Sequence, residues 1–259
     1  MVVRRALRYA QGLAGLRGDD VILASFPRSG NTWLRFVLRN YLERMEGAGS
    51  AVDFERVDAV MPELGADDLR RPWPYRALPR FVKTHQRWLP FFRQQRAVLL
   101  LRDPRDVMVS YFHYEQSKLR PRFTGSFAGF IRHRRFGLRA WFAHARSWLG
   151  RAPVVARYED LRANDVATCA RLFTSLAIPY DTDGLREAVE RSRFEEIRKV
   201  EKERGPDKPG MARFRAGAQF ARKGVTGGWT EHFDPADVAY YEAHLRRYPD
   251  VAAALQASS

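Results

Sequence analysis

The stretch of residues 21–41, VILASFPRSGNTWLRFVLRNY, constrains the fold more than any other part of the chain. It begins with an apolar run, VILA, that is typical of a strand buried on both faces. Pro27 and Gly30 then supply residues suited to a tight loop, and a helical pattern of apolar residues follows. The sequence therefore predicts a strand, a tight loop and a helix in direct succession.

The loop in this stretch has the chemistry of an anion site. A helix that begins directly after a tight loop directs free backbone N–H groups at whatever occupies the loop. Arg28 and the hydroxyls of Ser29 and Thr32 add further donors. We interpret the loop as a P-loop-like phosphate cradle, and the alternative is an ordinary turn that Gly30 merely closes. It is not a standard P-loop, because Asn31 stands where the motif requires lysine.

Apolar strand patterns alternate with helical patterns along the rest of the chain. Such alternation predicts an α/β fold with a central parallel sheet flanked by helices. The length of 259 residues suits a single domain, assigned to residues 21–259, after a basic helix or loose arm at residues 1–20. The other expected strands lie near 80–85, 97–102 and 153–161, and the expected helices near 106–116, 165–177, 185–192, 193–204 and 235–247.

The net charge of +15 indicates anionic partners, namely a nucleotide, an acidic metabolite, a membrane surface or nucleic acid. Arginine-rich genomic composition is the alternative for much of this charge. The single cysteine, Cys169, excludes an intramolecular disulfide framework and a cysteine-based zinc site. No apolar run approaches the roughly 18 residues of a membrane span, and the basic start is not a convincing signal peptide. These features predict a cytoplasmic protein.

Two further strands end in polar residues. The strand near 80–85 carries Lys83 and His85 at its end, where a structural hydrogen-bonding role for the histidine is the alternative. Arg102 ends the strand near 97–102, and Ser110 follows one turn into the next helix. Because ligands of open parallel sheets bind beyond the carboxyl ends of the strands, Arg28 and Arg102 are expected to hold two separate phosphates.

An ion pair with Asp103 or Asp106 is the alternative role for Arg102.

Three irregular stretches complete the chain. Residues 46–80 are interpreted as an excursion over the surface. Residues 115–140 mix basic and aromatic residues, which suits either nucleic acid or a substrate lid. Residues 205–228 are rich in glycine and basic residues and are interpreted as a lid.

The motifs together resemble one family, the sulfotransferases that use 3′-phosphoadenosine 5′-phosphosulfate (PAPS). SFPRSGNTW resembles the 5′-phosphosulfate loop of that family, and FVKTH resembles its catalytic strand. LRDPRDVMVSYFHY resembles the 3′-phosphate motif, and ARKGVTGGW resembles the late R-K-G-x-x-G-x-W segment. Their order and spacing agree over most of the chain.

The resemblance implies a role for each matching residue. Arg28 and the four residues that follow it would hold the 5′-phosphosulfate, namely Ser29, Gly30, Asn31 and Thr32. The adenine would contact Trp33, Tyr158, Ser192 and Phe194. The 3′-phosphate would contact Arg102, Ser110, Arg222, Lys223 and Gly224. His85 would be the general base, with Lys83 and Arg28 beside the transferring sulfonate.

The resemblance thus predicts an enzyme that transfers sulfonate from PAPS to a hydroxyl group and releases adenosine 3′,5′-bisphosphate (PAP), without a metal ion. The acceptor is a small molecule or a glycan, and no nucleic-acid partner is expected. Many soluble members of the family carry lysine at the position of Arg28, and this chain lacks their dimer segment after Trp229, so the oligomeric state is not predicted. The alternatives are a nucleotide or nucleoside kinase with an eroded P-loop, and a non-catalytic nucleic-acid-binding protein.

Overall fold

The computed structural model describes residues 12–47, 60–204, 214–215 and 226–257. Four parallel strands form its central sheet in the order β2-β1-β3-β4. Their bounds are β1 (Val21–Ser25), β2 (Phe81–Thr84), β3 (Arg96–Leu101) and β4 (Val154–Arg157). The predicted α/β fold with a central parallel sheet is therefore confirmed.

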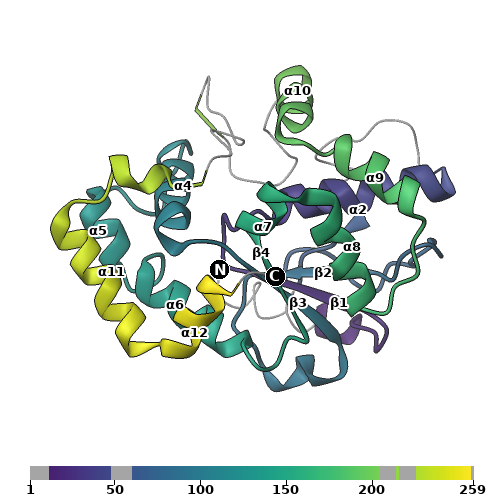
Figure 1. The fold of residues 1–259 in the computed structure, drawn as a ribbon, viewed down its shortest axis with the longest axis horizontal. Helices are drawn as coiled ribbons and strands as arrows, with labels where there is room; N and C mark the ends of the chain where they lie inside the picture. The colour runs from purple at the N-terminus through teal and green to yellow at the C-terminus, as the bar shows by residue number, and fades with distance from the viewer. Residues whose placement is uncertain (1–11, 48–59, 205–213, 216–225, 258–259) are drawn as a thin grey trace.

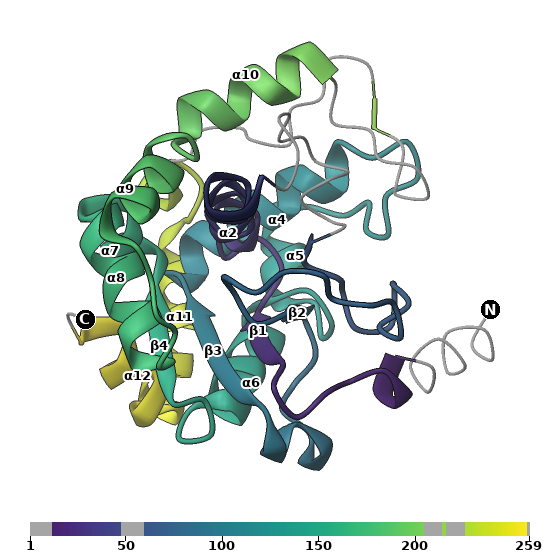
Figure 2. The same cartoon turned by 90° about the vertical axis from the view of Figure 1, so that its right-hand side faces the viewer.

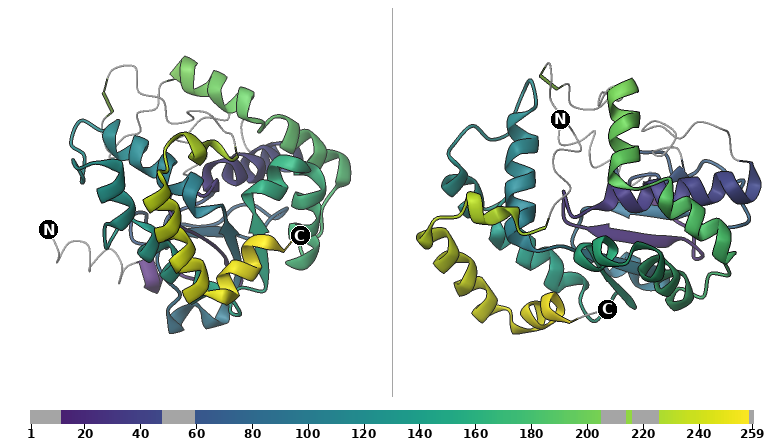
Figure 3. Two further views of the ribbon diagram at one scale, coloured as in Figure 1. Left: turned by 60° about the vertical axis from the view of Figure 1, so that its left-hand side comes forward. Right: turned by 45° about the horizontal axis from the view of Figure 1, so that its top comes forward.

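Helices cover both faces of the sheet (Figures 1 and 2). One layer holds α2 (Asn31–Glu46), α7 (Tyr158–Ala163), α8 (Asp165–Ser175) and α9 (Thr182–Glu190). The other holds α4 (Pro104–Gln116), α5 (Phe127–Arg132), α6 (Leu138–Trp148), α11 (Pro235–Arg247) and α12 (Pro249–Gln256). Three further elements are η1 (Pro90–Gln94), α10 (Phe194–Arg204) and η2 (Gly228–Glu231), of which α10 projects beyond the carboxyl edge of the sheet (Figure 3).

Strand β1 feeds both hydrophobic cores because successive side chains of a strand point to opposite faces. Val21 and Leu23 belong to the core shared with α2, α8 and α9. Ile22 and Ala24 belong to the core shared with α4, α5, α6 and α11. All four side chains are fully buried, as the apolar run at the start of the strand predicts.

The order of the strands places a ligand site at the carboxyl end of β1. β2 lies on one side of β1, and β3 followed by β4 lies on the other. The chain passes from β1 through α2 to β2, whereas it passes from β3 through α4 and on to β4. The connections of β1 and β3 therefore diverge and leave a crevice between the two strand ends. Such a switch point is where open parallel sheets bind their ligands.

Two of the expectations from the sequence are wrong in detail. The strand predicted over 153–161 stops at Arg157, and Tyr158 begins α7, whose first turn carries Glu159 and Asp160. Acidic residues are favoured in a first turn because they face the positive end of the helix. The stretch 46–80 is more than a surface excursion, since side chains from its described part lie in the core, among them Met61, Leu64, Leu69 and Leu78.

The last helix, α12, has no counterpart among the predicted elements. It packs against α6 and α11 and buries Val251 in the core beneath α6. Among the described residues, no helix is long and apolar enough to cross a membrane.

Candidate active site

The loop between β1 and α2 leaves the amino end of α2 open. Arg28 and Gly30 both have a positive φ, at 73° and 97°, and Gly30 stands at the cap position of α2 without a side-chain cap. A β-carbon at Gly30 would lie 2.4 Å from the ring of Tyr158, so only glycine fits this approach. No acidic residue occupies the first turn of α2. The predicted anion cradle therefore has an uncapped helix end, and the first turn of α2 brings no carboxylate to repel an anion.

The side chains of the loop also fit a bound phosphate group. The hydroxyl oxygen of Ser29 is buried and has no hydrogen-bond partner among the described residues, and proteins rarely leave a buried polar atom unpaired. Thr32 and Trp33 are half-buried in the first turn of α2. The side-chain amide of Asn31 instead points into the protein and donates to the Ser25 hydroxyl at 3.1 Å. Asn31 can therefore offer its backbone N–H to the cradle, while its amide braces the end of β1.

The second expected corner, at the end of β3, lies directly against the first. The Arg102 guanidinium donates from Nη1 to the carbonyl oxygen of Arg28 at 3.3 Å and lies over the Tyr158 ring, 4.3 Å from its centroid. Arg28 in turn donates from Nε to the Ser110 hydroxyl at 3.2 Å. The structure thus gathers Arg28, Gly30, Arg102, Ser110 and Tyr158 at one point of the crevice.

A bound anion would stabilise the positive charge of Arg28. The pKa of its guanidinium is lowered to about 10, chiefly by burial and also by the positive charge of Arg102, whereas Tyr114 and then Glu201 act to raise it. The guanidinium lies over the Tyr114 ring, 4.8 Å from its centroid. Two neighbouring cations that repel one another in a partly dry site are stabilised by any anion placed between them.

His85 is attached to the same loop. Its Nδ1–H donates to the carbonyl oxygen of Ser25 at 2.7 Å, so in the neutral ring Nε2 is the free acceptor. Burial, and then the charge of Lys83, lower the pKa of His85 to about 4. The imidazole is therefore neutral near pH 7, and this arrangement matches a proton acceptor that the end of β1 holds in place.

Lys83 points toward a residue that the sequence did not single out. Its ammonium group lies 2.7 Å from Oε2 of Glu63, and burial lowers its pKa. Glu63 falls in the irregular stretch before β2, where nothing in the pattern marks it as different from other loop carboxylates. Glu63 pairs with Lys83 as an added bridge at the edge of the sheet. In the sequence, the apolar Leu64, which is buried, is the weak signal of that bridge.

The residues expected around the adenine lie beside α2. The Ser192 hydroxyl accepts a hydrogen bond from Asn40 at 2.8 Å and donates to the carbonyl oxygen of Ala188 at 2.7 Å. Phe194 opens α10 and is half-buried. The hydroxyl of Ser192 is thus already bonded within the protein, and it retains one lone pair for a further donor.

Arg222, Lys223 and Gly224 lie outside the described residues, as does most of the stretch 205–228 that the sequence assigns to a lid. The chain just beyond them is anchored to α4. The Asp106 carboxylate accepts from the backbone N–H groups of Gly227 and Trp229, at 2.8 and 3.1 Å. The sequence indicates Asp106 as an alternative ion-pair partner of Arg102, and the structure adds its hydrogen bonds to the late segment.

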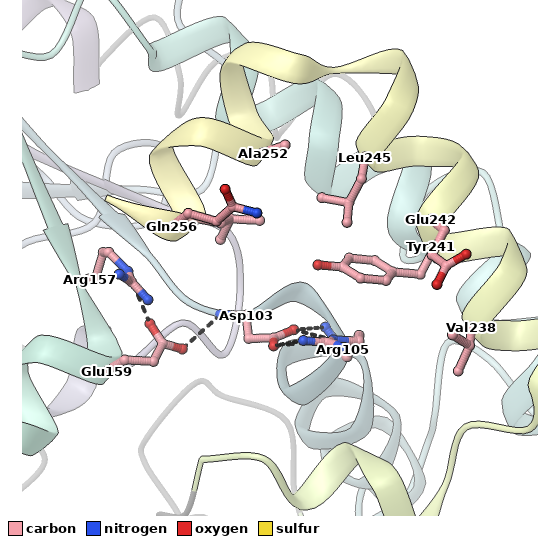
Figure 4. A pocket seen from close by; sticks show the side chains of 11 residues that line it. Asp103, Arg105, Arg157, Glu159, Val238, Tyr241, Glu242, Leu245, Ala252 and Gln256 are labelled. Carbon is pink, nitrogen blue, oxygen red and sulfur yellow. Dashed lines mark hydrogen bonds and ion pairs between the residues drawn. The ribbon is translucent and has the colours of Figure 1, made fainter. Parts of the chain in front are cut away.

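A separate pocket of about 350 Å³ lies behind the second corner (Figure 4). Its polar wall includes two ion pairs, Asp103 with Arg105 at 2.6 Å and Arg157 with Glu159 at 3.9 Å, and a further carboxylate at Glu242. Arg105 also lies over the ring of Trp229, 3.8 Å from its centroid. None of the site residues predicted from the sequence lines this pocket, and it is therefore separate from the candidate active site.

Comparison with known proteins agrees with this geometry. The sulfotransferase domain family matches residues 18–253, and the chain therefore belongs to the sulfotransferase family. Sulfotransferase 1B1 of Canis lupus familiaris is 27% identical over 237 residues, which cover 85% of this chain and 80% of that protein. Human sulfotransferase 2B1 is 28% identical over 263 residues, which cover 94% of this chain and 68% of that protein.

Two solved structures share the fold. A mouse sulfotransferase complexed with PAP has a TM-score of 0.68 and 21% identity, and the match covers 97% of this chain and 94% of that chain. Retinol dehydratase in complex with retinol and PAP has a TM-score of 0.71 and 21% identity, with coverage of 95% and 85%. Membership of the family supports sulfonate transfer as the activity. Among the described residues, no group of three or more histidine, cysteine, aspartate or glutamate side chains could hold a metal ion.

Proposed function

We propose that this protein transfers a sulfonate group from PAPS to a hydroxyl group of a small molecule or glycan and releases PAP. The observation that carries the proposal is the meeting of the two corners, where Arg102 donates to the carbonyl of Arg28. A nucleotide with phosphate on both sides of its ribose fits two adjacent cationic corners better than a nucleotide with phosphate on one side. The solved structures with this fold include complexes with PAP, which is such a nucleotide.

In this proposal the open end of α2 holds the 5′-phosphosulfate, with Ser29, Thr32 and the Arg28 guanidinium as further donors. Arg102 and Ser110 hold the 3′-phosphate, and Trp33, Tyr158, Ser192 and Phe194 surround the base. Arg222, Lys223 and Gly224 complete the 3′-phosphate site, as the resemblance of the late motif implies.

The chemistry follows from the position of His85. The donor supplies an electrophilic sulfonate joined to a phosphate oxygen. Nε2 of His85 accepts the proton of the acceptor hydroxyl as its oxygen forms a bond to sulfur, and the bond from sulfur to the phosphate oxygen breaks with its electron pair on that oxygen. In this proposal Arg28 and Lys83 supply fixed positive charge that stabilises the negative charge developing on that oxygen.

The two alternatives have less support. A kinase would need a lysine at the position of Asn31, whose side chain is turned toward Ser25. A nucleic-acid-binding surface along residues 115–140 would use its positive charges, yet Lys118 and Arg122 both pair with the buried Glu115, while Arg120, Arg134 and Arg135 are exposed. Arg132 pairs with Asp237.

The aromatic rings beside the loop suit an apolar acceptor. Phe26 follows β1 directly and packs edge-on against Tyr111 and His144, with centroids 6.0 and 5.9 Å apart. Retinol and androsterone are bound in solved retinol dehydratase structures of this fold, and these are apolar molecules with a hydroxyl group. A hydroxyl on an apolar body is therefore the first acceptor class to screen.

The test begins with a thermal shift against PAP and an acceptor screen with labelled PAPS. With an acceptor in hand, His85→Ala should lower kcat by about a hundredfold or more while PAP affinity is retained. His244→Ala is the matched control, because His244 lies on α11 and bonds only to its own helix in the described contacts. Turnover of His85→Ala close to that of the control would remove His85 from the mechanism.

A further inference from the structure

A short segment before β2 is attached to the edge of the sheet at Lys83. The backbone N–H of Lys83 donates to the carbonyl oxygen of Pro62, and the N–H of Leu64 donates to the carbonyl oxygen of Lys83, both at 2.9 Å. Glu63 and Lys83 are therefore paired residues of a parallel bridge. Side chains of paired residues stand on the same face of a sheet, so the backbone alone brings this carboxylate and this ammonium group together.

The backbone of Glu63 is held as firmly as its side chain. Its N–H donates to the Asp67 carboxylate at 2.7 Å, and its carbonyl oxygen accepts from the N–H groups of Ala66 and Asp67 at 3.0 Å. Buried Leu64 anchors the segment on one side. Oε2 of Glu63 lies 2.7 Å from Nζ of Lys83, and the side chains of Glu63 and Lys83 are 29% and 11% exposed. This carboxylate is therefore a built part of the site and not one member of a mobile surface ion pair.

Two cations, Lys83 and Arg35, and the imidazole of His85 act electrostatically on this carboxylate. Burial alone would raise the pKa of Glu63, but Lys83, His85 and Arg35 outweigh burial and hold that pKa at about 2. Arg35 belongs to α2, the helix of the anion cradle, and its Nη2 lies 3.5 Å from the carbonyl oxygen of Met61. Glu63 is thus a shared counter-ion between the strand that carries His85 and the helix that holds the donor.

The charge of Glu63 opposes the effect of its neighbours on His85. Burial, Lys83 and Arg35 lower the pKa of His85, whereas Glu63 raises it. A base that has taken a proton becomes an imidazolium, and two nearby cations disfavour that state. The fixed carboxylate of Glu63 offsets this repulsion, because its negative charge favours the imidazolium.

We propose that Glu63 is a positioning residue of the sulfonate transfer, which fixes the ammonium group of Lys83 beside His85 and supplies the negative charge that stabilises protonated His85. This inference rests on the proposed function. Glu63 itself touches Lys83 and acts on the reacting atoms only through Lys83 and His85.

The test removes the charge while keeping the shape. Glu63→Gln should lower kcat by about tenfold or more, whereas PAP affinity and the KM for the donor change by less than about threefold. Glu187→Gln is the matched control, because Glu187 forms an exposed ion pair with Arg44 at 2.9 Å between α9 and α2. The control should match the wild-type protein in each measurement.

A second readout does not depend on turnover. In an NMR titration of the histidines, Glu63→Gln should shift the His85 pKa downward relative to wild type, and Glu187→Gln should leave it unchanged. In a double-mutant cycle, Glu63→Gln should cost much less in a Lys83→Met background, because its effect passes largely through Lys83. A wild-type protein that transfers no sulfonate would contradict the proposed function. The His85 titration would still test whether the charge of Glu63 raises the His85 pKa.

Several results would overturn the inference. One is a kcat and a His85 titration in Glu63→Gln that match the Glu187→Gln control. Another is a parallel loss of PAP affinity and kcat, which would make Glu63 part of the donor site or of the fold. If Glu63→Gln does not fold, Glu63→Asp carries the test, since its shorter carboxylate cannot keep the 2.7 Å contact without a shift. An unchanged kcat in Glu63→Asp would then contradict the positioning role.

Discussion

The two corners of the crevice have the same local order of strand, loop and helix. They differ in whether a side chain caps the amino end of that helix. At the β1 corner, α2 begins at Gly30 without a side-chain cap and without an acidic residue in its first turn. At the β3 corner, Asp103 caps α4 by accepting from the N–H of Arg105 at 2.8 Å, and Pro104 has no N–H to offer. One helix end is open to an anion and the other is closed.

This difference assigns a different kind of binding to each corner. The β1 corner can use backbone N–H groups and the positive end of α2, so it suits a group whose charge changes during the reaction. The β3 corner has only side chains to offer, chiefly Arg102 and Ser110, and these suit recognition of a fixed phosphate. We infer that the first corner serves catalysis and the second serves selection of the nucleotide.

The largest expected effect is at the open corner. Arg28→Ala should lower kcat/KM by roughly a hundredfold to a thousandfold, as does the loss of a donor that stabilises developing charge in other enzymes. Arg28→Lys should retain more activity, because positive charge is the main requirement. Steady-state kinetics and PAP calorimetry measure both variants. If kcat and PAP affinity both survive in Arg28→Ala, the open corner is not the phosphosulfate site.

The next effect separates the corners by ligand. PAP should bind at least about a hundredfold more tightly than 5′-AMP, since two charge-assisted contacts are worth about 1.5–3 kcal/mol each. Arg102→Ala should remove much of that preference and change 5′-AMP affinity little, because the 5′ group is held at the other corner. Calorimetry with both nucleotides on wild type and variant decides this. Equal wild-type affinities would leave the 3′-phosphate site without support.

Local sequence predicts each corner separately, but it does not show that they touch. The loop at Arg28 and the charged end of β3 can both be predicted from the sequence, because glycine, proline and aspartate each favour particular turns or helix caps. The bond from Arg102 to the carbonyl of Arg28 depends on β1 and β3 being neighbours in the sheet. The role of Tyr158, which contacts both corners, depends in addition on β4 ending one residue earlier.

Glu63 shows the same limit more clearly. Its contact with Lys83 spans 20 residues and arises from a single bridge at the sheet edge, which no periodic pattern announces. The fold class, the four strands of the sheet and most helices follow from hydrophobic pattern, since burial dictates them. Pairs of polar side chains follow from topology, and topology is decided by the whole chain.

The corners should also respond differently to acid, because His85 bonds to Ser25 at the β1 corner. Its pKa is lowered to about 4 in the folded protein, mainly by burial, so between about pH 6.5 and 4 the unfolded chain binds a proton that the folded chain does not. Stability should therefore be unaffected by this group above pH 7 and should fall as the pH drops through that window. The full loss is on the order of 3 kcal/mol.

Urea unfolding at pH 7, 6 and 5 measures this effect. His85→Gln should flatten the dependence, although buried His144, whose pKa is lowered to about 3, contributes with the same sign. A dependence in His85→Gln as steep as that of wild type would show that His85 is not held neutral in the folded protein.

The smallest effect tests the closed corner itself. Asp103→Ala removes the cap of α4 and should lower the free energy of unfolding by about 1 kcal/mol. Asp234→Ala is the matched control, because Asp234 caps α11 in the same way by accepting from the N–H of Asp237 at 2.8 Å. Urea unfolding should show similar losses for both variants. PAP affinity should stay within about twofold of wild type in both, since a closed helix end takes no part in binding the donor. If Asp103→Ala weakens PAP binding by tenfold while Asp234→Ala does not, the amino end of α4 belongs to the donor site, and the contrast between an open and a closed corner fails.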